Sequence, residues 1–536
     1  MHSRPIRFTV SLAVILLLAG PVQIAGSDDD SLKVRMKEFA EVLSATAYWS
    51  ADAPTPDELV YSSVRGMLKT LDPHSTFLEP RSYSQMRDKQ TGSYFGVGLT
   101  VGERNKRITV ISPMQGSPAA RLGVRAGDVI VEIDGMATDQ LTYEEVVKRL
   151  KGPKGTNVSF QVRRVGMDDP IPFTITRAAI PTTSISAVVI VRPEVGYVRI
   201  NDFTYTTGRE FDEALARLQR DGMKKLIIDL RGNGGGLLDA ALEVSDHFLE
   251  KGKMIVYTEG RTADADQKYQ AEGRRRTLNI PVVIMVDHGS ASASEIVAGA
   301  IQDQDRGLIV GETSWGKGLV QSVYNLQYGA ALALTTSKYF TPAGRNIQRD
   351  FSSIYDYFVS ETEASRGVPI EERKVFKTFS GRKVYGSGGI TPDVIVKPRE
   401  LSRTLQLIEA RGLYFDYGVE YEARHPDVTR DLKVTPAMVE DLVKLAAAKK
   451  IGSVEEILGS IRLPADRAYL ERALRAEIIA ARFGYEASYP DRVAADDEVA
   501  RAADLLPEAE KITARAASAA AEKMAREGGS KVPVSY

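Results

Sequence analysis

The feature that most constrains the fold is a strand followed by a small-residue turn and a helix, which occurs twice in mid-chain. Residues 225–230 read Lys-Leu-Ile-Ile-Asp-Leu and run into Arg-Gly-Asn-Gly-Gly-Gly and a helical pattern over 238–249. Residues 280–286 are also apolar and lead into the serine-rich stretch 289–295 and a second predicted helix. Repeated strand–turn–helix units predict a mostly parallel sheet with its sites at the carboxyl ends of the strands. We therefore expect an α/β core over residues 180–400.

The rest of the chain predicts an α/β multidomain protein with helical N- and C-terminal segments. At about 150 residues per domain, 536 residues correspond to three or four domains, and 43% hydrophobic residues suffice for several cores. Residues 31–91 are expected to be helical, and residues 401–536 read as a helical region with a partly disordered tail. For that C-terminal region we favour a simple appendage over a docking role. The helical spacing in the N-terminal segment is carried by Leu32, Met36, Phe39 and Leu43.

Residues 1–26 have the features of a targeting signal. His2, Arg4 and Arg7 form a basic stretch, and residues 8–19 form an apolar stretch of signal-peptide length. That stretch is short for a membrane span, which needs about 20 residues. The cleavage site is poorly defined. We expect export to the periplasm or another extracytoplasmic location, with an uncleaved membrane anchor as the alternative.

Charge and residue usage exclude several classes of function. The net charge of −1 gives no electrostatic support for nucleic-acid binding, and the basic run 274–276 reads as a solvated loop. The chain has no cysteine, which excludes thiol nucleophiles, disulfides and cysteine-based metal sites. Its five histidines are scattered without metal-ligand spacing. We therefore expect neither a metal nor another cofactor.

Residues 92–178 combine short β-runs with glycine turns. The quartet Gly96-Val97-Gly98-Leu99 precedes a strand over 108–111, and Gly127-Asp128 and Asp134-Gly135 follow in order. This segment resembles a PDZ domain inserted before the core, and the quartet matches the carboxylate-binding loop of that family. Glycines leave successive N–H groups free to point at one carboxylate, and an extended peptide can add to the neighbouring strand edge. The resemblance implies binding of polypeptide C-termini or a docking role.

The serine-rich stretch has both a structural and a chemical interpretation. Ser292 and Glu295 have the spacing of a capping box, and hydroxyl residues are common helix N-caps. A serine at a helix N-terminus can also use the N–H groups there to stabilise a developing negative charge. The glycine-rich turn 232–236 can likewise be a turn that needs positive φ, or a source of N–H groups for an oxyanion.

A base for such a serine has two candidates. Lys317 lies between two glycines and can act if burial lowers its pKa from about 10.4. His288 precedes Ser292 by four positions and offers a serine–histidine arrangement, although we favour local packing for it. The residues alone do not choose Ser292 over Ser290 or Ser294.

Five motifs occur between residue 71 and residue 344 in a recognisable order. They are Leu71-Asp72-Pro73-His74-Ser75, Asp229-Leu230-Arg231-Gly232-Asn233-Gly234-Gly235-Gly236, Ser290-Ala291-Ser292-Ala293-Ser294-Glu295, Gly311-Glu312-Thr313 with Gly316-Lys317-Gly318, and Tyr339-Phe340-Thr341-Pro342-x-Gly344. Together they resemble the C-terminal processing peptidases, also called tail-specific proteases. The resemblance covers residues 31 to about 400 and implies that the core is a serine peptidase.

The resemblance assigns the catalytic roles. It makes Ser292 the nucleophile, and Lys317, 25 residues later, the general base. Gln321, four residues beyond the lysine, becomes the residue that orients it.

The resemblance also places the oxyanion hole at the N–H of Ala293 and at one N–H of the glycine-rich turn. We favour Gly235 there, with Gly234 and Gly236 as alternatives. Arg177, after the last strand of the PDZ-like segment, matches an arginine that couples the PDZ domain to the active site in some relatives.

We therefore expect an exported serine endopeptidase that recognises polypeptide C-termini, in which neutral Lys317 activates Ser292. A catalytically silent PDZ scaffold or adaptor on the same fold is the alternative. An esterase of non-peptide substrates is disfavoured because the serine motif lacks the Gly-x-Ser-x-Gly elbow. The expected partners are polypeptides with free C-termini, a second copy bound through the terminal helices, and an adaptor protein.

Overall fold

The structure, a computed structural model, divides into two units, residues 1–71 and residues 72–536. It describes the whole chain except residues 1–28, 53, 275–276, 354–356, 358–369 and 529–536. The predicted targeting signal and the end of the predicted disordered tail lie outside the described residues.

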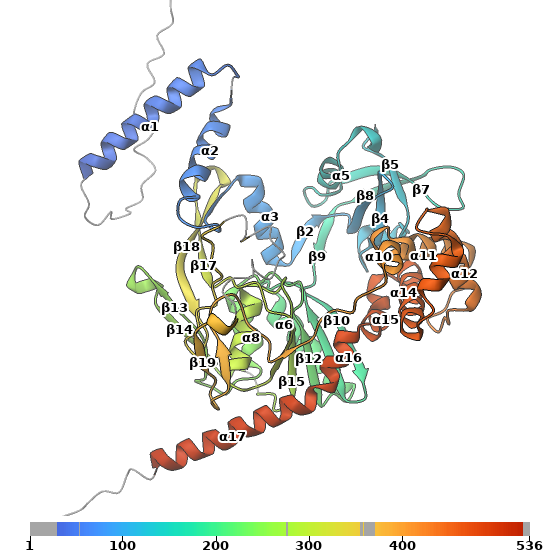
Figure 1. The fold of residues 1–536 in the computed structure, drawn as a ribbon. Coiled ribbons are helices and arrows are strands. Elements are labelled where there is room, and N and C mark those ends of the chain that lie inside the picture. The colour runs from blue at the N-terminus through green and yellow to red at the C-terminus, as the bar shows by residue number, and fades with distance from the viewer. Residues whose placement is uncertain (1–28, 53, 275–276, 354–356, 358–369, 529–536) are drawn as a thin grey trace, which may run out of the picture. The chain divides into compact units, whose positions relative to one another are not determined.

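The described part of the first unit consists of helices α1 (Asp29–Trp49) and α2 (Pro56–Leu68) (Figure 1). The start of α2 follows directly from its sequence. The Thr55 hydroxyl accepts the N–H of Glu58 at 3.2 Å, and the Glu58 carboxylate accepts the N–H of Thr55 at 2.8 Å. Pro56 begins the helix, where its missing N–H is not needed. The helical character predicted for the N-terminal segment is confirmed, except at residues 76–78, which form strand β1.

The PDZ-like segment is built on an antiparallel sheet in the order β3-β4-β5-β7-β8, with β6 paired to β5. Val158, Phe160 and Val162 alternate inward along β7, as the period of two requires. A separate ribbon of β2 and β9 joins the chain before the segment to the chain after it. The elements are β2 (Ser93–Gly96), β3 (Leu99–Arg104), β4 (Arg107–Pro113), α4 (Pro118–Arg121), β5 (Val129–Ile133), β6 (Met136–Ala137), α5 (Tyr143–Leu150), β7 (Asn157–Arg163), β8 (Ile171–Thr176) and β9 (Ala178–Pro181).

The core has a six-stranded sheet in the order β10-β11-β12-β15-β16-β21. Only the β10–β11 pair is antiparallel, which confirms the predicted mostly parallel sheet. β12 and β15 are neighbours, with Ile228 opposite Ile284. The turns that follow them, here called the glycine turn (residues 230–237) and the serine turn (residues 287–292), therefore lie at the same edge. The strands are β10 (Ile185–Arg192), β11 (Val195–Ile200), β12 (Lys225–Asp229), β15 (Val282–Val286), β16 (Leu308–Gly311) and β21 (Val394–Ile395).

Helices cover both faces of this sheet. On one face α6 (Thr207–Arg220), α7 (Leu238–Asp246) and α8 (Ala293–Asp303) form the larger apolar core (Figure 1). On the other, α16 (Asp497–Asp504) and α17 (Leu506–Gly528) bury apolar residues against β12, β15 and β16. The expectation of a simple appendage is wrong for these two helices, because they complete the second face of the core.

A five-stranded antiparallel sheet that we did not predict lies beside the core, in the order β1-β18-β13-β14 with β17 paired to β18. Its strands are β1 (Thr76–Leu78), β13 (Met254–Gly260), β14 (Gln267–Gln270), β17 (Leu319–Asn325) and β18 (Ala331–Phe340). A small hairpin pairs β19 (Val375–Lys377) with β20 (Lys383–Tyr385), and α3 (Pro80–Thr91) precedes β2.

Six further helices form the first part of the C-terminal region. The first five share their own apolar core, whereas Val493 of the sixth belongs to the core on the second face of the sheet. A capping box of Ser453 and Glu456 is present at the start of one of them. The helices are α10 (Arg403–Ala410), α11 (Leu413–Arg424), α12 (Pro436–Ala448), α13 (Val454–Ser460), α14 (Pro464–Phe483) and α15 (Tyr489–Ala494).

Candidate active site

The structure distinguishes the three candidate serines by the hydrogen bonds that their hydroxyls donate. The Ser290 hydroxyl donates to the carbonyl of Leu230 at 2.8 Å, and the Ser294 hydroxyl donates to the carbonyl of Asn233 at 2.9 Å. Both side chains are fully buried. Ser292 is half-buried, and its hydroxyl donates to no group in the described part of the chain. Of the three, Ser292 alone has a hydroxyl that is available to a base.

Ser292 is held in a backbone conformation that few residues other than glycine adopt. Its φ is 56° and its ψ is −114°, immediately before α8. The Tyr339 hydroxyl donates to its carbonyl at 3.3 Å, and the Glu295 carboxylate accepts its N–H at 2.8 Å. Strain of this kind persists only where neighbouring groups enforce it, and here it presents Ser292 at a helix N-terminus that favours negative charge.

Glu295 joins the serine turn to the loop that carries the lysine. Its fully buried carboxylate accepts the N–H groups of Ser292, Lys317 and Gly316 at 2.8, 2.9 and 2.7 Å. The Ser314 hydroxyl donates to it at 2.5 Å. Burial raises the pKa of Glu295, and these four donors oppose that shift by stabilising the carboxylate. Because the N–H groups of Ser292 and Lys317 reach the same oxygen, the two residues are close neighbours.

Lys317 is held on its other side by Gln321. The Lys317 Nζ donates to the amide oxygen of Gln321 at 2.8 Å, and the Gln321 amide donates to the carbonyl of His74 at 2.5 Å. Burial lowers the pKa of Lys317, and the charges of Glu295 and Asp72 oppose that shift only in part. The described structure has no hydrogen bond between Lys317 and Ser292. Gln321 therefore lies where it can orient the amine, which has no carboxylate at ion-pair distance among the described residues.

A tight turn at Asp72 fixes the carbonyl that receives Gln321. One oxygen of Asp72 accepts the N–H groups of His74 and Ser75, both at 2.8 Å, and the Thr335 hydroxyl at 3.0 Å. The His74 ring lies 2.6 Å from the Tyr357 hydroxyl. Burial, together with the charge of Lys317, lowers the pKa of His74 to about 4, against the opposing effect of Asp72. His74 is therefore neutral at pH 7.

Asn233 ties the glycine turn to the serine turn. Its side-chain amide donates to the carbonyl of Ile200 at 2.9 Å, and its backbone carbonyl accepts the N–H of Ala291 at 3.0 Å. Its side-chain oxygen accepts the N–H of Gly235 at 2.9 Å. The two turns are thus one hydrogen-bonded assembly.

Gly235 lies against the nucleophile. A Cβ at this position would come within 2.8 Å of the Ser292 Cβ and 3.0 Å of the Ala293 nitrogen, and its φ is +102°. Its N–H, however, donates to Asn233 in this conformation, whereas the N–H groups of Gly234, Gly236 and Ala293 have no hydrogen-bond partner among the described residues. Ala293 is the first residue of α8, where N–H groups lack a partner within the helix. The choice among the three glycines stays a prediction.

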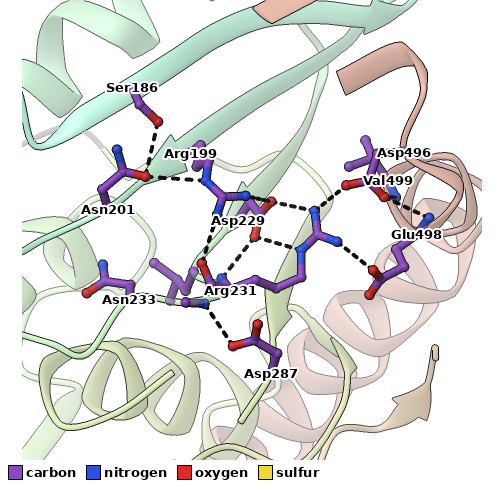
Figure 2. Close-up of polar contacts among 12 residues, drawn as sticks. Ser186, Arg199, Asn201, Asp229, Arg231, Asn233, Asp287, Asp496, Glu498 and Val499 are labelled. Carbon is purple, nitrogen blue, oxygen red and sulfur yellow. Dashed lines mark hydrogen bonds and ion pairs between the residues drawn. The ribbon is translucent and has the colours of Figure 1, made fainter. Parts of the chain in front are cut away.

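Buried charges hold the start of the glycine turn (Figure 2). Asp229, which is fully buried, accepts the N–H of Arg231 at 2.9 Å and its guanidinium at 2.7 and 3.0 Å. Arg199 donates to the same carboxylate at 3.0 Å and to the carbonyl of Arg231 at 3.1 Å. The next N–H, that of Gly232, donates to Asp287 of the serine turn at 2.8 Å. Both backbone groups of Arg231 are therefore fixed.

The predicted carboxylate-binding loop, Gly96–Leu99, runs from the last residue of β2 to the first residue of β3, which is an edge strand of its sheet. Gly98 has φ +79°, and its carbonyl accepts the Ser117 hydroxyl at 3.0 Å. Along the same edge, the Tyr143 hydroxyl of α5 donates to the carbonyl of Val101 at 2.9 Å. An edge strand beside a helix can receive an extended peptide as an added strand.

Arg177 lies inside the PDZ-like segment. Its guanidinium donates to the Thr156 hydroxyl and the Asn157 carbonyl, both at 2.8 Å, and to the Arg149 carbonyl at 2.5 Å. It thereby connects the end of α5 to the start of β7. None of its recorded contacts reaches Ser292 or Lys317, so the predicted coupling role stays a prediction.

The His288 ring contacts Thr313 and Glu312, not Ser292. Its Nδ1 lies 2.8 Å from the carbonyl of Thr313, and its Nε2 lies 3.7 Å from Glu312. These contacts agree with local packing. Across the described residues there is no cluster of three or more acidic or histidine side chains that could hold a metal ion. The same residues include no helix long and apolar enough to cross a membrane.

Sequence reasoning missed three supporting residues. Glu295 was interpreted only as a helix cap, and Asp72 only as part of a motif. Asn233 was one letter of the glycine-rich run. Their spacing to nearby serines and glycines is visible in the sequence, but each also binds a partner from a distant segment. These partners are Lys317 for Glu295, Thr335 for Asp72 and Ile200 for Asn233.

Comparison with known proteins gives matches in the same regions. The family model described as Peptidase family S41 matches residues 194–353, and the one described as PDZ domain matches residues 109–164. The carboxy-terminal-processing protease of Bartonella bacilliformis is 36% identical over 329 residues, which are 61% of this chain and 75% of that protein. The carboxy-terminal processing protease CtpA of Bacillus subtilis is 31% identical over 345 residues, 63% of this chain and 72% of that one. A solved structure, the photosystem II D1 C-terminal processing protease, is 29% identical with a TM-score of 0.36, covering 68% and 88% of the two chains.

Proposed function

Since this chain belongs to the carboxy-terminal processing proteases of peptidase family S41, which are serine-type proteases, we propose that Ser292 and Lys317 carry out its peptide hydrolysis. The observation that carries the proposal is the Glu295 carboxylate. One of its oxygens accepts the N–H groups of both residues, and among the three serines only Ser292 has a hydroxyl free to donate.

The proposed reaction is an acyl transfer through Ser292. Neutral Lys317 takes the hydroxyl proton of Ser292, and the oxygen attacks the peptide carbonyl to form a tetrahedral intermediate. The amine leaves with a proton from Lys317, and water then hydrolyses the acyl-enzyme. Gln321 keeps the lysine amine oriented. The N–H of Ala293 and one N–H of the glycine turn, for which we favour Gly235, stabilise the oxyanion. A Gly235 donor would need its N–H to turn away from Asn233.

Substrate selection is assigned to the PDZ domain. Its loop Gly96–Leu99 would bind a C-terminal carboxylate, and the free edge of β3 would pair with the residues that precede it. Arg177 would couple this binding to the core. Residues 1–26 would direct export or anchor the chain, so the substrates would be extracytoplasmic polypeptides. We also propose that the chain associates with a second copy through its terminal helices and that it binds an adaptor protein.

The test is hydrolysis of an unfolded protein such as casein by wild type, Ser292→Ala and Lys317→Ala. We expect both variants to lose at least about 1,000-fold in kcat/KM. A fluorophosphonate probe, followed by peptide mass spectrometry, should label Ser292 and neither Ser290 nor Ser294. Activity retained by either variant, or labelling of another serine, would reject the assignment.

The same assay tests the silent-scaffold alternative, which predicts that wild type does not hydrolyse casein. Tail recognition is tested separately with two peptides that differ only in a free or amidated C-terminus. The free carboxylate should bind Ser292→Ala at least about tenfold more tightly. Equal binding would remove the tail-recognition claim and leave proteolysis intact.

A further inference from the structure

The start of α16 is bonded to the glycine turn through Arg231 (Figure 2). The Arg231 guanidinium donates to Asp496 at 2.7 Å and to Glu498 at 2.8 Å, in addition to its bonds with Asp229. The exposed fractions of the three side chains are 10% for Arg231, 28% for Asp496 and 14% for Glu498. Pairs this well enclosed are only weakly screened by solvent.

The two carboxylate oxygens of Asp496 accept hydrogen bonds from different groups. One accepts the N–H groups of Glu498 and Val499 at 2.9 and 3.1 Å and so caps α16, and the other accepts Arg231. The orientation of the cap and the position of the arginine are thus set by one carboxylate. The helix itself is fixed by its apolar side, which includes the fully buried Ala502.

The path from this ion pair to the nucleophile is short. Arg231 is followed by Gly232, whose N–H bonds to Asp287, and by Asn233, which holds Ala291 and the N–H of Gly235. Gly235 packs against Ser292 so closely that a single added methyl group would clash. A displacement of about 1 Å in a catalytic group can reduce a rate about 100-fold.

We propose that Asp496 and Glu498 are positioning residues for the reaction at Ser292, which hold the Arg231 guanidinium and thereby keep the glycine turn in place against the nucleophile. This inference rests on the proposed function of Ser292. Asp496 and Glu498 would thereby contribute to catalysis from a C-terminal helix that begins more than 260 residues downstream of Arg231.

The test uses the full chain with Asp496→Asn and Glu498→Gln combined. Asparagine is also a good N-cap, so α16 should remain capped while both charges are lost. We expect kcat to fall about tenfold while KM stays within about twofold, because the turn acts in the transition state. The matched control is Asp504→Asn, which removes the exposed ion pair of the same helix with Arg192 and should leave both constants within about twofold.

A double-mutant cycle shows whether the acids act through the arginine. On an Arg231→Met background, the two acid substitutions should cause no further loss of kcat. A full additional loss, or an unchanged kcat in the wild-type background, would overturn the proposal. If the double variant does not fold, Glu498→Gln alone leaves the cap intact and should lower kcat about threefold, and no reduction would be equally decisive.

Amide hydrogen exchange separates this inference from the proposed function. Exchange at residues 232–236 should accelerate at least about fivefold in the double variant and not in Asp504→Asn. If wild type and Ser292→Ala hydrolyse substrate equally, the function of Ser292 fails, and the exchange result still decides whether α16 positions the turn. Unchanged exchange at these residues would reject the positioning role.

Discussion

Two enclosed basic side chains, Arg231 and Lys317, lie on the two segments that pack around Ser292, and their partners differ in charge. Arg231 has three carboxylates at 2.7–3.0 Å, from Asp229, Asp496 and Glu498. Lys317 has no carboxylate at ion-pair distance among the described residues, and its amine bonds to the neutral amide of Gln321.

The pKa values follow the partners. Burial alone would lower the pKa of Arg231, but the charges of Asp229 and Asp496 more than offset it and raise that pKa above the usual arginine value. Burial lowers the pKa of Lys317, with only partial opposition from Glu295 and Asp72. The difference fits two roles. A cation that positions an oxyanion turn must stay charged, whereas a cation that serves as a base must lose its proton.

Among the changes that test this contrast, Gly235→Ala in the glycine turn is expected to have the largest effect. The added Cβ would lie 2.8 Å from both the Ala291 oxygen and the Ser292 Cβ at a φ of +102°, so the turn or the nucleophile must shift. We expect kcat to fall at least about 100-fold, a loss comparable to removal of an oxyanion donor. Gly234→Ala is the matched control, because no atom lies within 4 Å of its Cβ, and it should stay within about threefold of wild type. Equal effects of the two substitutions would show that the turn is not held against Ser292.

Gln321→Glu should give Lys317 a carboxylate partner, such as Arg231 has, and so favour its charged form. A carboxylate in the place of the amide oxygen, 2.8 Å from the Nζ, would raise the pKa of Lys317 by stabilising its charged form. Since only the neutral amine accepts the serine proton, kcat/KM at pH 7 should fall about 10- to 100-fold, with recovery as pH rises. The measurement is the pH profile of kcat/KM beside Gln321→Met, which removes the hydrogen bond without adding charge. A profile of Gln321→Glu with an unshifted midpoint would contradict Lys317 as the base.

Glu295 accepts the N–H groups of both Ser292 and Lys317, so Glu295→Gln should weaken the positioning of both residues. An amide NH₂ would face N–H donors that now share a fully buried carboxylate, and we expect a loss of about 2–3 kcal/mol in the free energy of unfolding. The kcat should fall about tenfold because Ser292 and Lys317 are no longer bound to one group. Urea unfolding monitored by circular dichroism measures the stability change. Glu145→Gln, in the exposed capping box of α5, is the control and should cost less than about 1 kcal/mol; an equal cost at both sites would mean that Glu295 is only a cap.

The sequence was informative wherever the structure depends on nearby residues. The apolar runs of β12 and β15 and the turns after them were predictable because strand period and glycine content are local properties. Ser292 was preferred only through the family spacing, since three adjacent serines look alike until their hydroxyl partners are known. The four donors to Glu295 come partly from residues 314–317, and side-chain direction over that separation cannot be read from composition.

The return of α16 to the sheet was missed for a similar reason. Its alanine-rich apolar side is thin, and its fit depends on the opposite face, where Tyr197 and Met285 complete the core. The antiparallel sheet around β17 and β18 was also missed. In β17 only Leu319 is buried, and β18 buries one side that includes the polar Ser337, so the apolar pattern of both strands is weak.

The smallest effect concerns the turn that supports Gln321. Because burial lowers the pKa of His74 to about 4, below the ordinary value of about 6.5, the unfolded chain binds this proton more readily between the two values. The contribution of neutral His74 to the free energy of unfolding should therefore be fully present above pH 6.5 and be lost as pH drops toward 4. The loss should be about 1–2 kcal/mol after allowance for partial exposure. His74→Gln should remove this part of the acid-dependent loss in urea unfolding at pH 7 and pH 4.5, while replacement of the exposed His425 with Gln should retain it. If His74→Gln leaves the acid dependence unchanged, the turn does not hold a neutral histidine beside Lys317, and the contrast between the two cations then rests on Gln321 alone.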